Sequence, residues 1–201
     1  MNTTGIILAG GKNLRYGRNK ALEKIGGITI FERIANKLHT ITDDIVVVTA
    51  KDSNVLPPLP FVRFVEDEYF EKGPLGGIYA GLQTAKYDIG LVVATDMPFL
   101  SVPLLKYLIS SADNYDVVIP RLRNNMLEAV HAVYRKTCLS LIKEHLETGR
   151  LQIRPILCKL NTRYIDEEEC RRYDPELNTF FNINRPSDFD RAQKIESQGK
   201  Q

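Results

Sequence analysis

Short apolar runs alternate with longer amphipathic segments along the chain, and this alternation predicts its secondary structure. Several runs are continuous in Val and Ile, as expected for strands covered on both faces. They predict strands at Gly5–Ala9, Ile45–Thr49, Val62–Val65, Ile89–Ala94, Val117–Pro120 and Val130–Tyr134. Helical spacing of apolar residues between the runs predicts helices at Phe31–Leu38, Ile78–Ala85, Val102–Ser110, Cys138–Leu146 and about Ser187–Glu196.

This order of elements predicts the fold class. Alternating strands and helices favour an α/β fold with a mainly parallel sheet and helices on both faces. The 201 residues are enough for one well-packed α/β domain. No linker or internal repeat divides them, so we expect a single domain over residues 1–201. Because ligands of open α/β sheets bind at the carboxyl ends of strands, residues that follow strands are the candidates for chemistry.

Composition narrows the classes of partner and the compartment. A formal net charge of +2 gives no argument for nucleic acid, and no apolar run approaches the roughly 20 residues of a membrane span. No signal peptide is apparent at the N-terminus. Cys138, Cys158 and Cys170 form no CxxC pair, which argues against a zinc site or a disulfide framework. These features predict a cytoplasmic protein.

The first predicted strand leads into a glycine-rich, basic loop, "LAGGKNLRYGRNKAL". Gly10 and Gly11 let the backbone turn and approach a ligand, and the N–H groups of such a loop can bind phosphate oxygens. Arg15 and Lys20 add positive charge. The loop matches neither GxxxxGK[ST] nor GxGxxG, so we interpret it as an anion-binding loop of another class.

A carboxylate follows the apolar run "IGLVVA". Asp96 lies at the carboxyl end of this predicted strand, and Pro98 prevents a helix from starting at once. An ionised carboxylate at a buried edge is costly unless it is paired or bound to a metal. Asp96 is therefore a candidate ligand of Mg²⁺ shared with substrate phosphates, and a helix N-cap or turn aspartate is the alternative.

Further candidates follow other predicted strands. Asp67 comes just after "RFVE". The segment "GPLGG", residues 73–77, is expected to be a turn leading into a helix whose N-terminus faces an anion or a polar base edge. Asn182 and Asn184, two apart in "FFNINRPSD", are candidates to complete a metal or ligand shell, with turn and cap amides as the alternative.

Other polar segments predict structure rather than chemistry. His131 lies in a predicted strand, and we expect it to be packed or to line the substrate rather than to act as a base. "DEEE", residues 166–169, is expected to be a solvated acidic run, and residues 121–128 are expected to form a loop.

These stretches together resemble the molybdenum cofactor guanylyltransferase family. "LAGGKNLRYGRNKAL" resembles the nucleotidyltransferase signature LAGGxSxRMGxxK, and "VED", "GPLGGI", "ATDMPFL", "HAVYR" and "FFNINRPSDF" follow in order. The resemblance runs from Gly5 to about Phe189. It implies a Rossmann-like three-layer α/β/α sandwich of the nucleotide-diphospho-sugar transferase type. It also implies transfer of GMP from GTP to the phosphate of molybdopterin, with release of pyrophosphate.

The resemblance further implies roles for the matching residues. Lys20, Arg15 and Asp96 would be catalytic, and Asp96 would bind Mg²⁺. Asn182 and Asn184 would contact molybdopterin. The nucleotide would be bound by Leu8, Ala9, Gly10, Gly11, Lys20, Thr49, Asp67, Gly76 and Asp96. Thr49 stands where an Asn contact to the base is common, which leaves base selectivity open.

The resemblance names the expected partners: GTP and molybdopterin as substrates, molybdopterin biosynthesis proteins and apo-molybdoenzymes, with no nucleic acid and no membrane. Two alternatives stay open. One is a related nucleotidyltransferase that uses CTP or a sugar-phosphate acceptor, and the other is a non-catalytic nucleotide-binding protein. A panel of nucleoside triphosphates separates the first, and Mg²⁺-dependent turnover separates the second.

Overall fold

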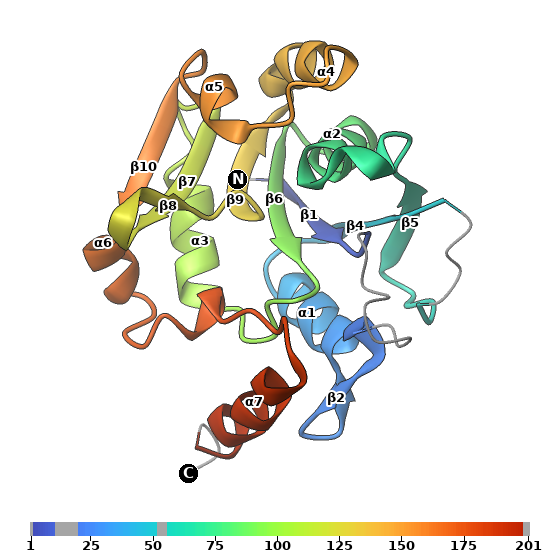
Figure 1. Cartoon of the computed structure of the whole chain (residues 1–201), viewed down its shortest axis with the longest axis vertical. Helices are drawn as coiled ribbons and strands as arrows, with labels where there is room; N and C mark the ends of the chain where they lie inside the picture. The colour runs from blue at the N-terminus through green and yellow to red at the C-terminus, as the bar shows by residue number, and fades with distance from the viewer. Residues whose placement is uncertain (1, 11–19, 52–55, 199–201) are drawn as a thin grey trace.

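The computed structural model describes residues 2–10, 20–51 and 56–198, and its core is a mixed eight-stranded sheet between two helical layers (Figure 1). The strands are β1 (Thr3–Leu8), β4 (Asp44–Thr49), β5 (Val62–Glu66), β6 (Ile89–Ala94), β7 (Val117–Leu122), β8 (Met126–Leu127), β9 (His131–Arg135) and β10 (Thr162–Asp166). Their order is β10-β7-β9-β6-β1-β4-β5, and β8 pairs with β7. β9 runs antiparallel to β6 and β7, whereas the neighbours of β1 and β4 are parallel. The predicted mainly parallel α/β sheet is confirmed.

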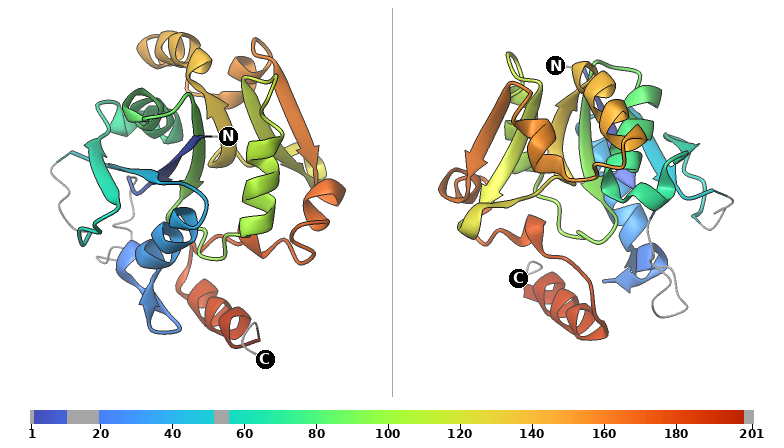
Figure 2. Two further views of the ribbon diagram at one scale, coloured as in Figure 1. Left: turned by 180° about the vertical axis from the view of Figure 1, so that it is seen from behind. Right: turned by 45° about the horizontal axis from the view of Figure 1, so that its top comes forward.

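Helices cover both faces of this sheet (Figure 2). The helices of the described chain are α1 (Ile30–His39), α2 (Pro74–Thr84), α3 (Val102–Ser110), α4 (Leu139–Glu147), α5 (Ile153–Leu157), α6 (Glu167–Arg171) and α7 (Pro186–Gln198). Of these, α7 lies beyond the end of the sheet, beside the short strand β2 (Lys24–Ile25). One apolar cluster packs α1 and α3 against side chains such as Ile7, and a second packs α2 and α4 against side chains such as Ile6. Because alternate residues of β1 enter opposite clusters, the whole strand is apolar or buried.

Local capping explains where two of the helices begin. Thr29 Oγ1 accepts a hydrogen bond from Glu32 N, and Glu32 Oε2 accepts one from Thr29 N, which forms a capping box at α1. Ser101 Oγ accepts from Leu104 N at the start of α3, as the sequence predicts. Among the described residues, no helix is long and apolar enough to cross a membrane.

Two helices begin earlier than the sequence predicts. The segment 73–77 is not a turn before α2, because Pro74 is already its first residue and Gly73, with φ of 66°, precedes it. Proline is favoured at the first helical position, where its missing N–H costs no hydrogen bond. α7 likewise begins at Pro186 rather than after Ser187.

Residues 121–128 also differ from the prediction. The segment is not simply a loop, because it ends β7 and contains β8. Residues 166–169 reach solvent as predicted: Asp166 and Glu168 are exposed, and Glu167 and Glu169 are half-buried. Glu167 opens α6 and pairs with Arg123 and Arg171. β10 is an edge strand whose side chains are mostly half-exposed, so "TRYID" lacks the apolar run that marks the inner strands.

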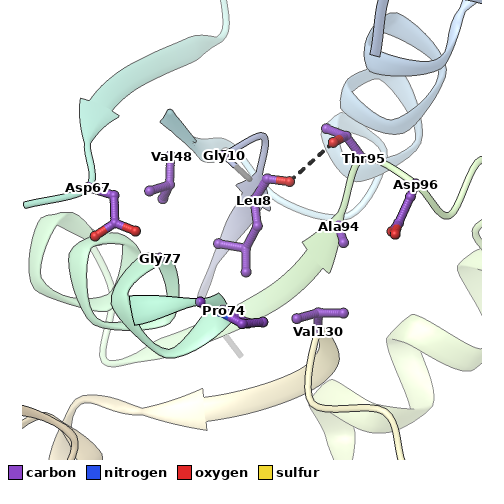
Figure 3. Close-up of a pocket in the computed structure, with 11 residues that line it drawn as sticks. Leu8, Gly10, Val48, Asp67, Pro74, Gly77, Ala94, Thr95, Asp96 and Val130 are labelled. Atoms are coloured by element: carbon purple, nitrogen blue, oxygen red, sulfur yellow. Dashed lines mark hydrogen bonds between the residues drawn. The ribbon is translucent and has the colours of Figure 1, made fainter. Parts of the chain in front are cut away.

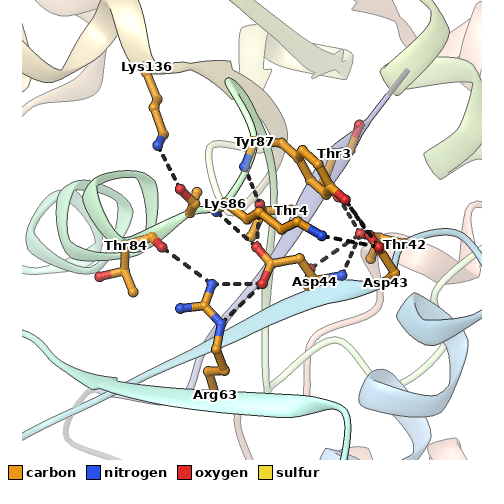
Figure 4. Close-up of polar contacts among 11 residues, drawn as sticks. Thr3, Thr4, Thr42, Asp43, Asp44, Arg63, Thr84, Lys86, Tyr87 and Lys136 are labelled. Atoms are coloured by element: carbon orange, nitrogen blue, oxygen red, sulfur yellow. Dashed lines mark hydrogen bonds and ion pairs between the residues drawn. The ribbon is translucent and has the colours of Figure 1, made fainter.

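A buried carboxylate ties the amino ends of the inner strands together (Figure 4). Asp44 Oδ2 accepts hydrogen bonds from Thr4 Oγ1 at 2.7 Å and Lys86 N at 3.0 Å. Its Oδ1 accepts from Arg63 Nε and Nη2 at 3.1 and 2.7 Å. Burial acts to raise the pKa of Asp44, but these donors outweigh it and hold the pKa below its usual value. This network fixes the end of the sheet opposite to the candidate site.

Candidate active site

A cavity of about 210 Å³ opens at the carboxyl edge of the sheet, beside the first residues of α2 (Figure 3). Figure 3 shows Asp67 and Asp96 on opposite sides of it, with Leu8 and Pro74 between them. The cavity is lined by Leu8, Gly10, Val48, Asp67, Gly73, Pro74, Gly77, Ala94, Thr95, Asp96 and Val130. It therefore lies where parallel α/β sheets bind their ligands.

Four residues proposed from the sequence line this cavity: Leu8, Gly10, Asp67 and Asp96. Two others, Ala9 and Thr49, are next to lining residues in the sequence. Ala9 N donates to Val48 O at 2.8 Å, so Ala9 fixes the chain as it leaves β1.

Thr49 follows the lining residue Val48 and alternates to the other side of β4. Its hydroxyl donates to Val65 O at 3.5 Å. Gly11 and Arg15 lie outside the described residues.

Asp67 and Gly76 form one tightly fitted corner of the cavity. Tyr69 N donates to Asp67 Oδ1 at 2.8 Å, and the carboxylate is only 7% exposed. Burial raises the pKa of Asp67, and this hydrogen bond offsets part of that rise. A Cβ at Gly76 would lie 2.8 and 2.9 Å from the carboxylate oxygens, so only glycine fits there without a shift. Gly76 therefore acts by letting α2 approach Asp67.

The N-terminus of α2 supplies hydrogen-bond donors to the same cavity. Gly73, Pro74 and Gly77 line it, and no side chain of the described residues caps the helix. The first turn of a helix has unpaired N–H groups and a partial positive charge. This arrangement can bind an anion or the polar edge of a base.

Lys20, Asp96 and the segment 182–184 lie together on the other side. Lys20 Nζ donates to Ile183 O at 2.9 Å and to Asn184 O at 3.4 Å. Ile183 N in turn donates to Asp96 O at 2.9 Å. Lys20 and Asp96 are thus joined through Ile183 by two consecutive hydrogen bonds. The structure brings together the cation and the carboxylate that the sequence proposed for one site.

The two asparagines of "NIN" have different surroundings. Asn182 is half-buried, and its side chain donates to Phe180 O at 3.3 Å. Asn184 is exposed, and its backbone N–H donates to Asp188 Oδ2 at 2.9 Å. These contacts hold the segment in place beside Lys20.

Asp96 is set up to hold a cation. Burial raises its pKa, and the positive charge of Lys20 opposes that effect. Its Oδ1 is buried, and within the described part of the chain it has no hydrogen-bond partner. A buried carboxylate oxygen of this kind is a hard ligand that fits Mg²⁺. In the described ranges, no group of three or more His, Cys, Asp or Glu could hold a metal.

His131 is a packed residue, as expected from the sequence. Its Nε2 lies 3.1 Å from Thr179 Oγ1, which also accepts from Ser101 N at 3.1 Å. Burial lowers the pKa of His131 to about 3, so the ring is neutral near pH 7. The histidine anchors the chain that leads to residues 182–184.

Sequence reasoning missed Glu128 and Val130. Val130 lines the cavity, and Glu128 is buried with 7% of its surface exposed. Burial raises the pKa of Glu128, and the negative charge of Asp96 raises it further. The sequence signal that could have indicated Glu128 is its position just before the apolar run "AVHAVY", because charged residues at strand ends are candidates for the site.

Together, the three-layer fold, the helix N-terminus and the paired lysine and carboxylate at the edge of the sheet define the class of a nucleotidyltransferase. The comparison with known families gives the same class: the MobA-like NTP transferase domain matches residues 5–162. The chain belongs to this family.

Curated relatives match over almost the whole chain. A molybdenum cofactor guanylyltransferase of Desulfosudis oleivorans is 36% identical over 98% of this chain and 97% of its own. A probable molybdenum cofactor guanylyltransferase of Pelotomaculum thermopropionicum is 34% identical over 96% of this chain and 92% of its own. The family is therefore shared along the full described fold.

Solved structures confirm the fold. Molybdopterin-guanine dinucleotide biosynthesis protein A from Archaeoglobus fulgidus superposes with a TM-score of 0.82 at 27% identity, covering 97% of this chain and 99% of that one. The 2-C-methyl-D-erythritol 4-phosphate cytidylyltransferase of Thermus thermophilus superposes with a TM-score of 0.72 at 15% identity, covering 98% and 100%. The second likeness shows the fold alone.

Proposed function

We propose that this protein transfers GMP from GTP to the phosphate of molybdopterin and releases pyrophosphate. The observation that carries the proposal is the cavity between the N-terminus of α2 and the Asp96 carboxylate, with Lys20 beside it. The names of the relatives and of the Archaeoglobus structure supply the identity of the two substrates.

The geometry supports an orientation for GTP. The donors of α2 and the corner formed by Asp67 and Gly76 suit the polar nucleoside end. Lys20 and Asp96, with a metal, suit the triphosphate on the other side. Gly11 and Arg15 are proposed to complete the phosphate contacts from the basic loop. Asn182 and Asn184 are proposed to lie near the pterin.

The reaction needs positioning and charge stabilisation rather than a protein nucleophile. An oxygen of the molybdopterin phosphate forms a bond to the α-phosphorus of GTP. The bond from that phosphorus to the oxygen bridging it to the β-phosphate breaks, and pyrophosphate leaves. Both reactants are anions, so Lys20 would reduce their repulsion and hold them in line.

Asp96 would hold Mg²⁺ when the ion is present. The buried, unpartnered Oδ1 within the described chain supports this role. Bound Mg²⁺ supplies positive charge next to the phosphates. Asp96 would hold the ion through this carboxylate oxygen.

We also propose that this protein is cytoplasmic. It would receive molybdopterin from biosynthesis proteins and pass the product to apo-molybdoenzymes. Co-purification with each class of partner tests this extension.

Product analysis tests the proposed reaction. The protein is incubated with molybdopterin, Mg²⁺ and each of GTP, CTP, ATP and UTP, and products are identified by mass spectrometry. The expected result is the guanine dinucleotide from GTP alone. Asp96→Asn should lower kcat/KM by roughly 10²–10³, the loss expected for one preorganised electrostatic contact. A cytosine dinucleotide as the main product, or no dinucleotide with any triphosphate, would reject the proposal.

A further inference from the structure

Glu128 is a buried acid whose position the reaction outlined above does not use. It lies between β8 and β9, and its backbone N–H donates to Pro120 O at 3.1 Å while its own carbonyl accepts from His131 N at 3.0 Å. Its place is therefore fixed from both sides. The residue is only 7% exposed.

The sheet register places Glu128 and Asp96 at the same end of two neighbouring strands. β6 and β9 are antiparallel, and Val93 pairs with His131. Asp96 lies three residues after Val93 and Glu128 three residues before His131, so both lie beyond this end of the paired strands. The charge of Asp96 acts on Glu128 accordingly. Val130 is two residues after Glu128 and lines the same cavity as Asp96 (Figure 3).

Two carboxylates in this arrangement need a cation. Burial of an ionised carboxylate without a partner is costly, and a second one beside it adds repulsion. Lys20 acts on Asp96 but also donates to Ile183 O and Asn184 O, so its donors are shared. A divalent ion with one or two carboxylates and several phosphate or water oxygens is the common Mg²⁺ arrangement.

We infer that Glu128 and Asp96 together bind the divalent cation of this site, with Glu128 as its second carboxylate ligand. The inference rests on the proposed function only for the remaining ligands, which are the phosphates of the nucleotide. Glu128 would thus contact the metal directly. The charge of the two ionised carboxylates, Glu128 and Asp96, would be neutralised by one Mg²⁺.

Metal binding without nucleotide tests this inference independently of the reaction. Metal-free protein is titrated with Mn²⁺, and free Mn²⁺ is measured by electron paramagnetic resonance. Wild type is compared with Glu128→Gln, Asp96→Asn and the control Glu147→Gln, which changes an exposed glutamate on α4. Glu128→Gln and Asp96→Asn should each weaken Mn²⁺ binding at least tenfold, and Glu147→Gln should bind as wild type does.

Thermal unfolding supplies a second measurement that a purely structural role would not reproduce. Without divalent ions, Glu128→Gln should melt at or above the wild-type temperature, because it removes repulsion from Asp96. With saturating Mn²⁺, wild type should melt above Glu128→Gln, because a ligand stabilises the state that binds it.

Unchanged Mn²⁺ affinity in Glu128→Gln overturns the inference, whether or not Asp96→Asn loses binding. A variant that melts below wild type without metal and keeps the same metal-induced shift also overturns it. Failure of the guanylyl transfer assay alone, with these metal results intact, rejects the proposed function and leaves the ligand assignment standing.

Discussion

Gly76 lies in the first turn of α2 and packs against the turn that holds Asp67. Replacing it with alanine tests how closely this part of the pocket must fit. The added Cβ would lie 2.6 Å from Tyr69 O and 2.8 and 2.9 Å from the two carboxylate oxygens of Asp67. Real Cβ atoms essentially never come within 3.0 Å of such atoms. Because one of the three atoms belongs to the backbone, Gly76→Ala must move either that turn or the start of α2.

The size of the effect follows from these contacts. Overpacking a filled site costs about 1–3 kcal/mol, and the preference of helices for alanine over glycine offsets about 0.5–1 kcal/mol. We expect a net loss of about 1–2 kcal/mol in the free energy of unfolding. In a domain of this size each kcal/mol lowers Tm by about 2–4 °C, so Tm should fall by about 2–8 °C.

The same displacement should weaken nucleotide binding. Loss of one hydrogen bond from the moved corner costs about 0.5–1.5 kcal/mol, which corresponds to a rise in the KM for GTP of roughly three- to tenfold. Thermal unfolding and pyrophosphate release measure the two effects. Gln83→Ala is the matched control, because it changes an exposed position on the same helix. If Gly76→Ala has the same Tm and the same KM for GTP as Gln83→Ala, the close fit at Gly76 is refuted.

Three further changes test other parts of the structure. Lys20→Ala should lower kcat/KM by roughly 10²–10³ in a pyrophosphate-release assay. The control is Lys143→Ala, which changes an exposed lysine on α4 and should leave kcat/KM unchanged. If both variants have equal rates, Lys20 does not have the proposed role. Asp44→Asn leaves two donors without an acceptor. It should lower the free energy of unfolding, measured in urea, by about 2–4 kcal/mol, because the half-exposed Arg63 can still be solvated by water. The KM for GTP should stay the same, and a stable variant would contradict the network. For His131, burial lowers the folded pKa to about 3, so the unfolded state binds more protons below about pH 6.5. Stability should therefore fall by about 2 kcal/mol from pH 7 to pH 5 in urea unfolding, and His131→Gln should remove that slope.

The inner part of the fold could be predicted because its physical signal is strong. β1, β4 and β6 are buried on both faces, so they appear as continuous apolar runs. α3 carries its own start signal in Ser101. β10 carries no such signal, because an edge strand keeps half of its side chains near solvent. α2 was placed too late because the glycines of its first turn are typical of turns in isolation and are required here by close packing.

The candidate site divides in the same way. Asp67 and Asp96 could be proposed because each follows a strand, and the sheet brings such residues to one edge. Glu128 could not, because it precedes its strand, and only the antiparallel pairing of β9 with β6 carries it to that edge. If every strand of the sheet were assumed to be parallel to its neighbours, Glu128 would be placed at the opposite end of the sheet. The contact of Lys20 with Ile183 O depends on the path of the chain after Thr179, which no local pattern specifies.

The central claim is that the α-phosphorus of GTP moves to the acceptor in this cavity. The most direct measurement follows GTP labelled with ³²P at the α or the γ position, incubated with molybdopterin and Mg²⁺, and separates the products. The α label should appear in the pterin dinucleotide and the γ label in pyrophosphate, and Asp96→Asn should slow both equally. If the α label remains in GTP, GDP or GMP while the protein binds GTP, the claim is contradicted.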